Sequence, residues 1–477
     1  MASDSIVSLA SVPSSYHAEQ TALVQGDERW TWGALDLRAR QWAQILLDAG
    51  VGPDELVAFA LPNGPEFFAL TFGIYIAGAT PAPLSPKLPP PEIEAILAQM
   101  QPAARAGLLP NPVPFPAPYS AKADWIGHVA AAWKACTSGG STGWPKVIID
   151  GRSAAFPADA EFLEIPAHGR VFVPGPLYHN GPFSAAVFAL LRGNTVVTMP
   201  RFDAATAVEI VASEKIDWAL MVPTMMQRIL RLDLSKSDLR NWTKVVHTAA
   251  PMPPASKLQW IERFGPEHIG EVYGATEGLV RTWISGREWL ERPGSVGRPT
   301  GGARIRIVAD DGTECPVGFV GEIYAMPPGG SGTSYRYLGA KRRATHDGWE
   351  SVGDIGHLDA QGFLYLADRR DDLIVSGGVN IWPAEVESAL ARHPAIVSCA
   401  VVGVPDDDLG QHVHAVIETS DASLDRDALR EFLRDFLPPE KIPRSVILTH
   451  GPVRDDAGKI RKKELVESYV AKRTKPD

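Results

Sequence analysis

The chain has 477 residues, of which 45% are hydrophobic and 21% are charged. This length suggests more than one domain, and the composition is that of a globular protein with a sizeable core. With 46 basic and 56 acidic residues, the formal net charge is −10, which disfavours nucleic acid and anionic membranes as partners. The widely spaced Cys136, Cys315 and Cys399 predict neither a disulfide framework nor a zinc site, and they suit a reducing compartment.

The amino-terminal residues 1–20 have neither a basic start nor a long apolar run. We therefore expect no signal peptide and no membrane span, and a cytoplasmic enzyme is the default.

Strand and helix patterns alternate along most of the chain. The predicted strands cover residues 21–32 as a hairpin, 56–60, 171–173, 196–199 and 245–248. The predicted helices cover residues 32–47, 67–77, 204–213 and 223–230. This alternation indicates an α/β fold of layered sheets with many parallel strands. The Pro- and Ala-rich residues 101–120 predict a loop or an irregular strand.

The composition changes near residue 368, where a dense charge cluster covers residues 368–372. A compact α+β pattern follows it, with helices predicted at residues 383–392 and 425–436 and strands at residues 399–404 and 414–418. We predict a large N-terminal domain at residues 1–370 and a small, mobile C-terminal α+β domain at residues 371–477.

The stretch from Thr137 to Lys146 holds three glycines, four hydroxyl groups, a proline and a lysine. Glycine permits close backbone approach, and successive amides and hydroxyls can donate to anionic oxygens. Residues 129–136 and 147–149 are predicted strands on either side. We predict a phosphate-holding loop, with a flexible surface turn as the alternative. The spacing differs from that of the P-loop of kinases and ATPases.

Three further stretches combine glycine with charge. Residues 271–278 place a hydroxyl and a carboxylate between glycines, a combination that suits phosphate and Mg²⁺. Residues 350–356 place one carboxylate in a glycine-flanked turn, as in sites that hold a ribose. Residues 455–463 carry a lysine behind a glycine. Each of the three stretches can instead be an ordinary turn or a solvent-exposed charged segment.

In this order, the motifs resemble the adenylate-forming superfamily of acyl- and aryl-CoA ligases, peptide-synthetase adenylation domains and firefly-type luciferases. The motifs are the Ser/Thr/Gly loop with Lys, Tyr-Gly-x-Thr-Glu, Gly-Asp, Asp-Arg-x-Asp-Asp…Gly-Gly and Gly-Lys. The resemblance extends from about Thr21 to Leu465. Residues 138–143 and 176–182 look closest to the bile-acid-type CoA ligase subgroup.

The resemblance implies that a carboxylic acid and MgATP form an acyl-adenylate with release of pyrophosphate, and that the acyl group then moves to coenzyme A. It implies a phosphate loop formed by Thr137, Ser138, Gly139, Gly140, Ser141, Thr142, Gly143 and Lys146. The other implied contacts are Thr276 and Glu277 for phosphate and Mg²⁺, Asp354 and Arg369 for ribose, and Tyr273, Gly274, Ala249, Ala250 and Pro251 for adenine. Lys459 matches the catalytic lysine, which meets the carboxylate and the α-phosphate.

The same resemblance implies a hinge at Asp371 and a thiol tunnel at Gly377 and Gly378, which would face the site in the second half-reaction. His179 stands where the family lines its acyl pocket; it is a candidate gate for the carboxylate, or else a core histidine. The other pocket candidates are Phe183, Val222, Thr224, Met225, His247, Ala275 and Leu279. No Asp follows the aromatic residue near this position, which disfavours an α-amino acid and favours a hydrophobic aryl, fused-ring or medium acyl acid.

Some positions depart from the family pattern, among them Gly139, Val147 and residues 454–456, but no charged catalytic group is lost. The stretch from Gln101 to Ala135 is short for the family. We keep three alternatives: loading of a separate carrier-protein thiol, a non-catalytic nucleotide-binding relative and a light-emitting enzyme. A homodimer is an assembly that we also consider.

Overall fold

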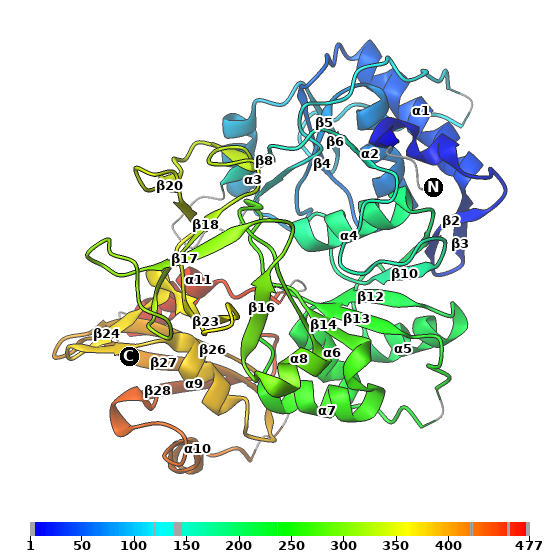
Figure 1. Cartoon of the computed structure of the whole chain (residues 1–477). Helices are drawn as coiled ribbons and strands as arrows, with labels where there is room; N and C mark the ends of the chain where they lie inside the picture. Colours follow the sequence, from blue (N-terminus) through cyan, green and yellow to red (C-terminus); the bar gives the residue numbers. More distant parts are fainter. Residues whose placement is uncertain are drawn as a thin grey trace.

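The computed structural model describes residues 5–118, 120–137, 146–235, 237–419, 421, 423–455 and 458–473, with only the backbone described at Asp368, Asp371, Lys472 and Arg473. The fold is mixed α/β, with a large N-terminal domain and a small C-terminal one (Figure 1). The predicted fold class is confirmed. Within the described residues, every helix is too short or too polar to cross a membrane.

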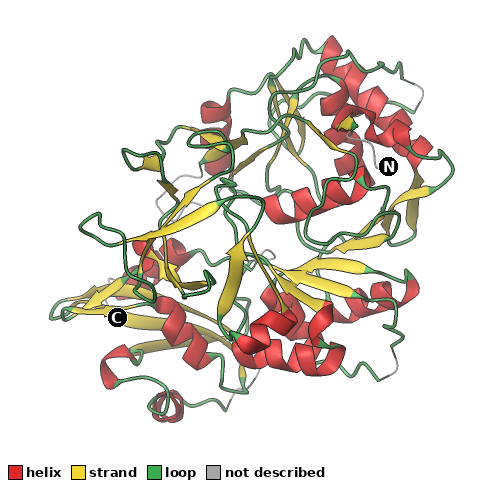
Figure 2. Cartoon of the chain, in the orientation of Figure 1, coloured by secondary structure: helices red, strands yellow, loops and turns green. Residues whose placement is uncertain are grey.

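A run of parallel strands forms the centre of the large domain. In spatial order these strands are β2 (Thr21–Gln25), β11 (Thr195–Thr198), β10 (Arg170–Val173), β12 (Trp218–Met221), β13 (Lys244–His247) and β14 (Ile269–Glu271). Successive residues of β10 enter opposite cores, because side chains alternate along a strand. Helix α4 (Asn180–Leu191) covers one face, and α5 (Ala204–Ser213), α6 (Pro223–Leu230) and α7 (Pro254–Phe264) belong to the other core (Figure 2).

The same sheet continues as antiparallel strands beyond β14. They are β15 (Thr282–Ser285), β16 (Ser295–Pro299), β23 (Leu364–Arg369), β22 (Asp354–Leu358), β18 (Gly321–Met326), β21 (Glu350–Ser351) and β20 (Arg343–Ala344), with β17 (Arg304–Val308) beside β18 and α8 (Gly286–Glu291) after β15. This part carries the chain from the parallel strands to the small domain.

A second layer holds the parallel strands β5 (Thr80–Pro83), β4 (Leu56–Ala60) and β6 (Ala104–Gly107). Helices α1 (Trp32–Asp48), α2 (Pro65–Ile76) and α3 (Pro90–Met100) belong to this region. Helix α1 begins at Trp32 because the Thr31 hydroxyl accepts a hydrogen bond from the Ala34 amide at 3.2 Å. The short strands β1 (Ile6–Ser8) and β9 (Ala155–Pro157) pair separately, and β3 (Glu28–Thr31) completes the predicted hairpin with β2.

The predicted phosphate loop joins an antiparallel pair, β7 (Ala135–Thr137) and β8 (Val147–Asp150), which β19 (Tyr335–Leu338) extends. The prediction of a strand over residues 129–136 is wrong for its first part, because β7 begins at Ala135. Before that point the Trp133 amide bonds to the Arg152 carbonyl at 3.0 Å, outside the strand ladder, and the indole enters the core.

The small domain has its own five-stranded sheet and core. The sheet contains β24 (Ile374–Ser376), β25 (Val379–Ile381), β26 (Ile396–Asp406), β27 (Gly410–Thr419) and β28 (Ser445–Thr449), and its helices are α9 (Pro383–Leu390), α10 (Arg426–Leu433) and α11 (Lys462–Arg473). The predicted boundary between residues 370 and 371 falls within the 3₁₀ turn η3 (Arg370–Asp372). The boundary itself stays a prediction.

Candidate active site

A cluster around Asp354 lies where the antiparallel part of the large sheet ends. Asp354 opens β22 and Arg369 closes β23, and the two residues are direct partners in the ladder. The Arg369 Nε donates to Asp354 Oδ1 at 3.2 Å, and the Tyr273 hydroxyl donates to Oδ2 at 2.6 Å. Burial, followed by the Asp354 charge, raises the pKa of Tyr273 well above its usual value. Tyr273 therefore stays a neutral donor, and the carboxylate is held between two side chains.

The segments predicted to contact adenine follow neighbouring parallel strands. Residues 249–251 come after β13 and Tyr273-Gly274 come after β14, whose last residues His247 and Glu271 are in register. The carboxyl ends of parallel strands meet at one edge of a sheet, so the two segments lie side by side. Ala249 has a φ of 75°, a conformation that a residue with a Cβ rarely adopts.

Glu277 is buried and accepts a hydrogen bond from the Tyr337 hydroxyl at 2.7 Å. Tyr337 lies on β19, opposite Ile148 of β8, and the Lys146 Nζ lies 5.4 Å from the centroid of its ring. Burial and the Glu277 charge raise the pKa of Tyr337. A carboxylate, a phenol and an ammonium are thus brought together from three separate segments of the chain. Thr276, next to Glu277, is half-buried.

The predicted phosphate loop is described only at its ends. Thr137 and Lys146 flank it, and the Thr137–Val147 pair closes the β7–β8 ladder at this point. Ser138, Gly139, Gly140, Ser141, Thr142 and Gly143 lie outside the described residues.

Lys459 comes from the small domain and lies in the electrostatic field of groups on the large one. Its amide donates to Asp455 Oδ1 at 2.9 Å, in a turn where Gly458 has a φ of +76°. A Cβ on Gly458 would lie 3.5 Å from the Val222 side chain, so this turn packs on the large domain. Burial lowers the pKa of Lys459, and Asp455, Arg369, Glu277 and Cys136 contribute by their charges. Lys459 therefore lies within range of the charges of Arg369 and Glu277.

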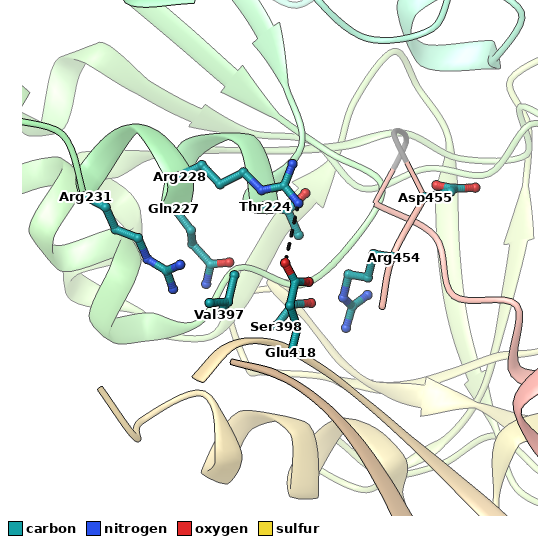
Figure 3. A pocket seen from close by; sticks show the side chains of 9 residues that line it. All are labelled: Thr224, Gln227, Arg228, Arg231, Val397, Ser398, Glu418, Arg454 and Asp455. Atoms are coloured by element: carbon teal, nitrogen blue, oxygen red, sulfur yellow. Dashed lines mark ion pairs between the residues drawn. The ribbon is translucent and has the colours of Figure 1, made fainter. Parts of the chain in front are cut away.

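A polar pocket marks where the small domain meets helix α6. It is lined by Thr224, Gln227, Arg228, Arg231, Val397, Ser398, Glu418, Arg454 and Asp455 (Figure 3). The Arg228 Nη2 lies 3.8 Å from Glu418 Oε1, and the Arg231 Nη2 donates to the Ile396 carbonyl at 3.2 Å. These contacts hold β26 and β27 against the end of α6.

The candidate acyl-pocket residues lie in several places. His179 directly precedes α4 and its ring lies 4.6 Å from that of Tyr178, while Phe183 is buried one turn later. Val222, Thr224 and Met225 stand at the junction of β12 and α6, and Thr224 lines the pocket at the domain interface. Ala275 and Leu279 line a separate hollow with Tyr273, Val280, Ile323, Ala325, Glu350 and Val352.

His247 is fully buried beside an ion pair. Lys257 Nζ donates to Glu271 Oε2, and His247 Nε2 lies 3.6 Å from the same oxygen. Burial, followed by the Lys257 charge, lowers the pKa of His247 well below its usual value. His247 is therefore a neutral group of the core at the carboxyl end of β13.

The residues predicted for the second half-reaction lie near the start of the small domain. The backbone of Asp371 lies in η3. Gly377 and Gly378, with φ of 56° and 82°, form the exposed two-residue turn between β24 and β25. Two successive positive φ values favour glycine at this turn.

Sequence reasoning missed two polar side chains of this region. Tyr337 holds Glu277 from 60 residues away, and the sequence offers no local signal for this pair. Lys134 is 3% exposed and contacts helix α4. Its signal was a lone lysine among apolar residues just before the predicted loop.

Comparison with known families places this chain in one class of proteins. A model described as "AMP-binding enzyme" matches residues 12–106 and 135–335, and one described as "AMP-binding enzyme C-terminal domain" matches residues 385–459. The chain therefore belongs to the family of AMP-binding enzymes. Residues 107–134 lie between the two matched stretches, in the region that looked short in the sequence.

Curated relatives narrow the class. Feruloyl-CoA synthase of an Amycolatopsis species is 30% identical over 472 residues, which cover 93% of this chain and 95% of that one. Long-chain-fatty-acid–CoA ligase FadD13 of Mycobacterium tuberculosis is 27% identical over 478 residues, with 93% and 94% covered. Our chain is accordingly an enzyme of the AMP-forming acid–CoA ligase class. These relatives do not favour the carrier-protein alternative, and the bile-acid-type subgroup stays a prediction.

A solved structure agrees with the fold. The o-succinylbenzoate CoA synthetase of Bacillus subtilis, in complex with its acyl-adenylate intermediate, superposes with a TM-score of 0.83 at 23% identity and covers 97% of this chain and 98% of that one. At this identity the likeness supports the two-domain architecture alone.

Proposed function

We propose that the protein activates a hydrophobic carboxylic acid with ATP to an acyl-adenylate, and then transfers the acyl group to coenzyme A with release of AMP. The observation that carries this proposal is the packing of the Gly458–Lys459 turn of the small domain on Val222 of the large one, within range of the charges of Glu277 and Arg369. A carboxylate that attacks the α-phosphate brings two anions together, and a cation at that point offsets their repulsion.

The large domain would hold the nucleotide. Asp354, fixed by Arg369 and Tyr273, can accept the two ribose hydroxyls. The loop from Thr137 to Lys146 would surround the phosphates with amides, hydroxyls and one ammonium. Residues 249–251 and Tyr273-Gly274 would border the adenine.

Glu277 and Thr276 fit a magnesium ion that accompanies ATP. Both offer the oxygen ligands that Mg²⁺ prefers, and the Tyr337 hydroxyl holds the Glu277 carboxylate in one orientation. When bound, the ion neutralises charge on the phosphates. The chain itself supplies Lys146 and Lys459 for the remaining charge.

The acid would enter near His179 and the carboxyl ends of β12 and β13. Relatives named for ferulate, indoleacetate and long-chain fatty acids support an aryl or acyl acid as the substrate class. Association with a carrier protein or with a second copy of the chain stays a prediction.

Acid-dependent exchange of pyrophosphate into ATP tests the first half-reaction. Ferulate, indole-3-acetate and dodecanoate serve as probes, and coenzyme A is then added to detect thioester and AMP. We expect exchange with at least one acid, loss of exchange when EDTA removes divalent cations, and thioester after addition of coenzyme A. Exchange without thioester would contradict the second half-reaction, and ATP binding without exchange would contradict the first.

A further inference from the structure

Lys134 is a buried cation that the proposed chemistry does not use. It immediately precedes β7, and its side chain is only 4% exposed. Its Nζ donates to Ser184 Oγ at 2.8 Å and to Asn180 Oδ1, and it lies 4.1 Å from the centroid of the Trp133 ring. A single side chain therefore links the strand that enters the phosphate loop to the first turn of α4.

The nearest carboxylate does not explain this lysine. Asp150 Oδ2 lies 3.9 Å from the Lys134 Nζ, whereas Arg152 holds Asp150 through Nε at 2.9 Å and Nη2 at 2.8 Å. Burial of an ammonium disfavours its charged form, and the positive end of α4 adds to this cost. A methionine would fill the space beside Trp133 without either cost. Packing alone therefore does not account for a lysine here.

The backbone and the side chain of Lys134 serve different elements. Its carbonyl accepts a hydrogen bond from the Asp150 amide at 3.1 Å, which continues the β7–β8 ladder. Its side chain reaches Asn180 and Ser184, which are four residues apart and share one face of α4. Removal of the side chain would thus release α4 and leave the ladder that carries the phosphate loop.

The face of α4 held in this way adjoins the residues expected to meet the acid. His179 directly precedes Asn180, and Phe183 precedes Ser184. The Phe183 ring packs on the Trp133 ring, with 5.9 Å between centroids. Trp133 and Lys134 therefore contact the start of α4 together, one through an apolar face and the other through hydrogen bonds.

We propose that Lys134 is a positioning residue for the carboxylic acid, because it fixes the first turn of α4, and with it His179, relative to the strand pair β7–β8. This inference rests on the proposed function. In this proposal the Lys134 side chain supports binding of the acid, whereas the β7–β8 ladder, which carries the phosphate loop, supports binding of ATP.

The test measures pyrophosphate exchange by the full-length wild type and by Lys134→Met, once with the acid varied at saturating ATP and once with ATP varied at saturating acid. The probe is whichever of ferulate, indole-3-acetate and dodecanoate the wild type activates fastest. We expect kcat/KM for the acid to fall about 10-fold to 100-fold, the range for loss of a hydrogen bond to a charged group, and KM for ATP to change less than about twofold. An equal loss for acid and ATP, or no loss, would overturn the proposal.

Two further variants test whether Lys134 acts through its contact with α4. Ser184→Ala removes one hydrogen-bond partner of Lys134 and should also lower kcat/KM for the acid. In the double variant, Ser184→Ala should cause no further loss beyond that of Lys134→Met, because both changes break the same contact. Additive effects would overturn the proposal. If Lys134→Met fails to fold, Ser184→Ala alone is the test: kcat/KM for the acid should fall and KM for ATP should stay unchanged. Lys244→Met, a part-buried lysine at the opposite end of β13 from His247, is the matched control and should leave both values unchanged.

The wild type separates the two proposals. Without exchange by the wild type for any of the three acids, the proposed function fails and this inference fails with it. With exchange by the wild type and unchanged variants, only the role of Lys134 fails.

Discussion

Stability measured against pH offers a direct test of the buried ammonium at Lys134. Burial lowers its pKa from 10.5 to about 8. Below about pH 8 the lysine is protonated in both the folded and the unfolded chain. Between about pH 8 and about 10.5 the unfolded chain still binds the proton that the folded protein has released, so the contribution of Lys134 to stability rises with pH in this window. Lys134→Met has no proton to exchange.

The magnitude follows from the two pKa values. Their difference corresponds to about 3 kcal/mol, at roughly 1.4 kcal/mol for each pKa unit. Relative to Lys134→Met, the free energy of unfolding of the wild type should therefore rise by about 3 kcal/mol between about pH 8 and about pH 10.5. Subtraction of the two curves cancels the other titrating groups that the variants share.

Urea unfolding followed by tryptophan fluorescence at several pH values is the assay. The exposed Lys463→Met, on α11, is the control, and its difference from the wild type should stay flat. If the difference in free energy of unfolding between wild type and Lys134→Met changes by less than about 0.5 kcal/mol from about pH 8 to about pH 10.5, the burial argument is refuted. A difference of the opposite sign would mean that the folded protein holds this proton more tightly than the unfolded chain does.

Three substitutions test the proposed site. Lys459→Met should lower the rate of pyrophosphate exchange about 10²-fold to 10³-fold, because a cation at the developing charge is lost; a circular dichroism spectrum checks the fold, and a loss under about threefold contradicts the role. Asp354→Asn should raise KM for ATP about 10-fold or more with a smaller effect on KM for the acid, because the ribose contact loses its charge; equal effects on both would count against it. Glu277→Gln should raise the Mg²⁺ concentration needed for half-maximal exchange, as a titration with MgCl₂ measures, and an unchanged midpoint would exclude Glu277 as a metal ligand.

Local pattern was enough to predict several helices and strands, chiefly in the parallel part of the large domain and in the small domain. The apolar spacing and the start of α1 depend on residues next to one another, and the helix runs from Trp32 to Asp48 as expected to within one residue. The strand before the phosphate loop is different. Residues 129–133 are apolar enough for a strand, yet the Trp133 amide bonds outside the ladder, and the strand β7 begins only at Ala135. Hydrophobicity indicated burial correctly, but pairing depends on a partner that no local window contains.

The candidate site likewise combines features that neighbouring residues predict with contacts that depend on the fold. Glycine, hydroxyl and charge patterns are local, and their order along the chain gave the family resemblance that implies roles for Asp354 and Lys459. The bond from Tyr337 to Glu277 and the reach of Lys134 to α4 join residues 60 and 50 positions apart. Such contacts depend on how sheets and helices pack, so a sequence without its fold does not predict them.

The short link from β23 to β24 limits how far apart the ends of the two sheets can lie. Arg369 ends β23 beside Asp354, and Ile374 begins β24, so only residues 370–373 connect them. Even fully extended, such a link spans about 17 Å. The small sheet is tethered on a short arm whose fixed end is the proposed ribose contact. The hinge predicted at Asp371 can therefore be tested with dyes placed on β22 and β26, because a turn about this arm changes their distance while the link keeps the two sheets from separating.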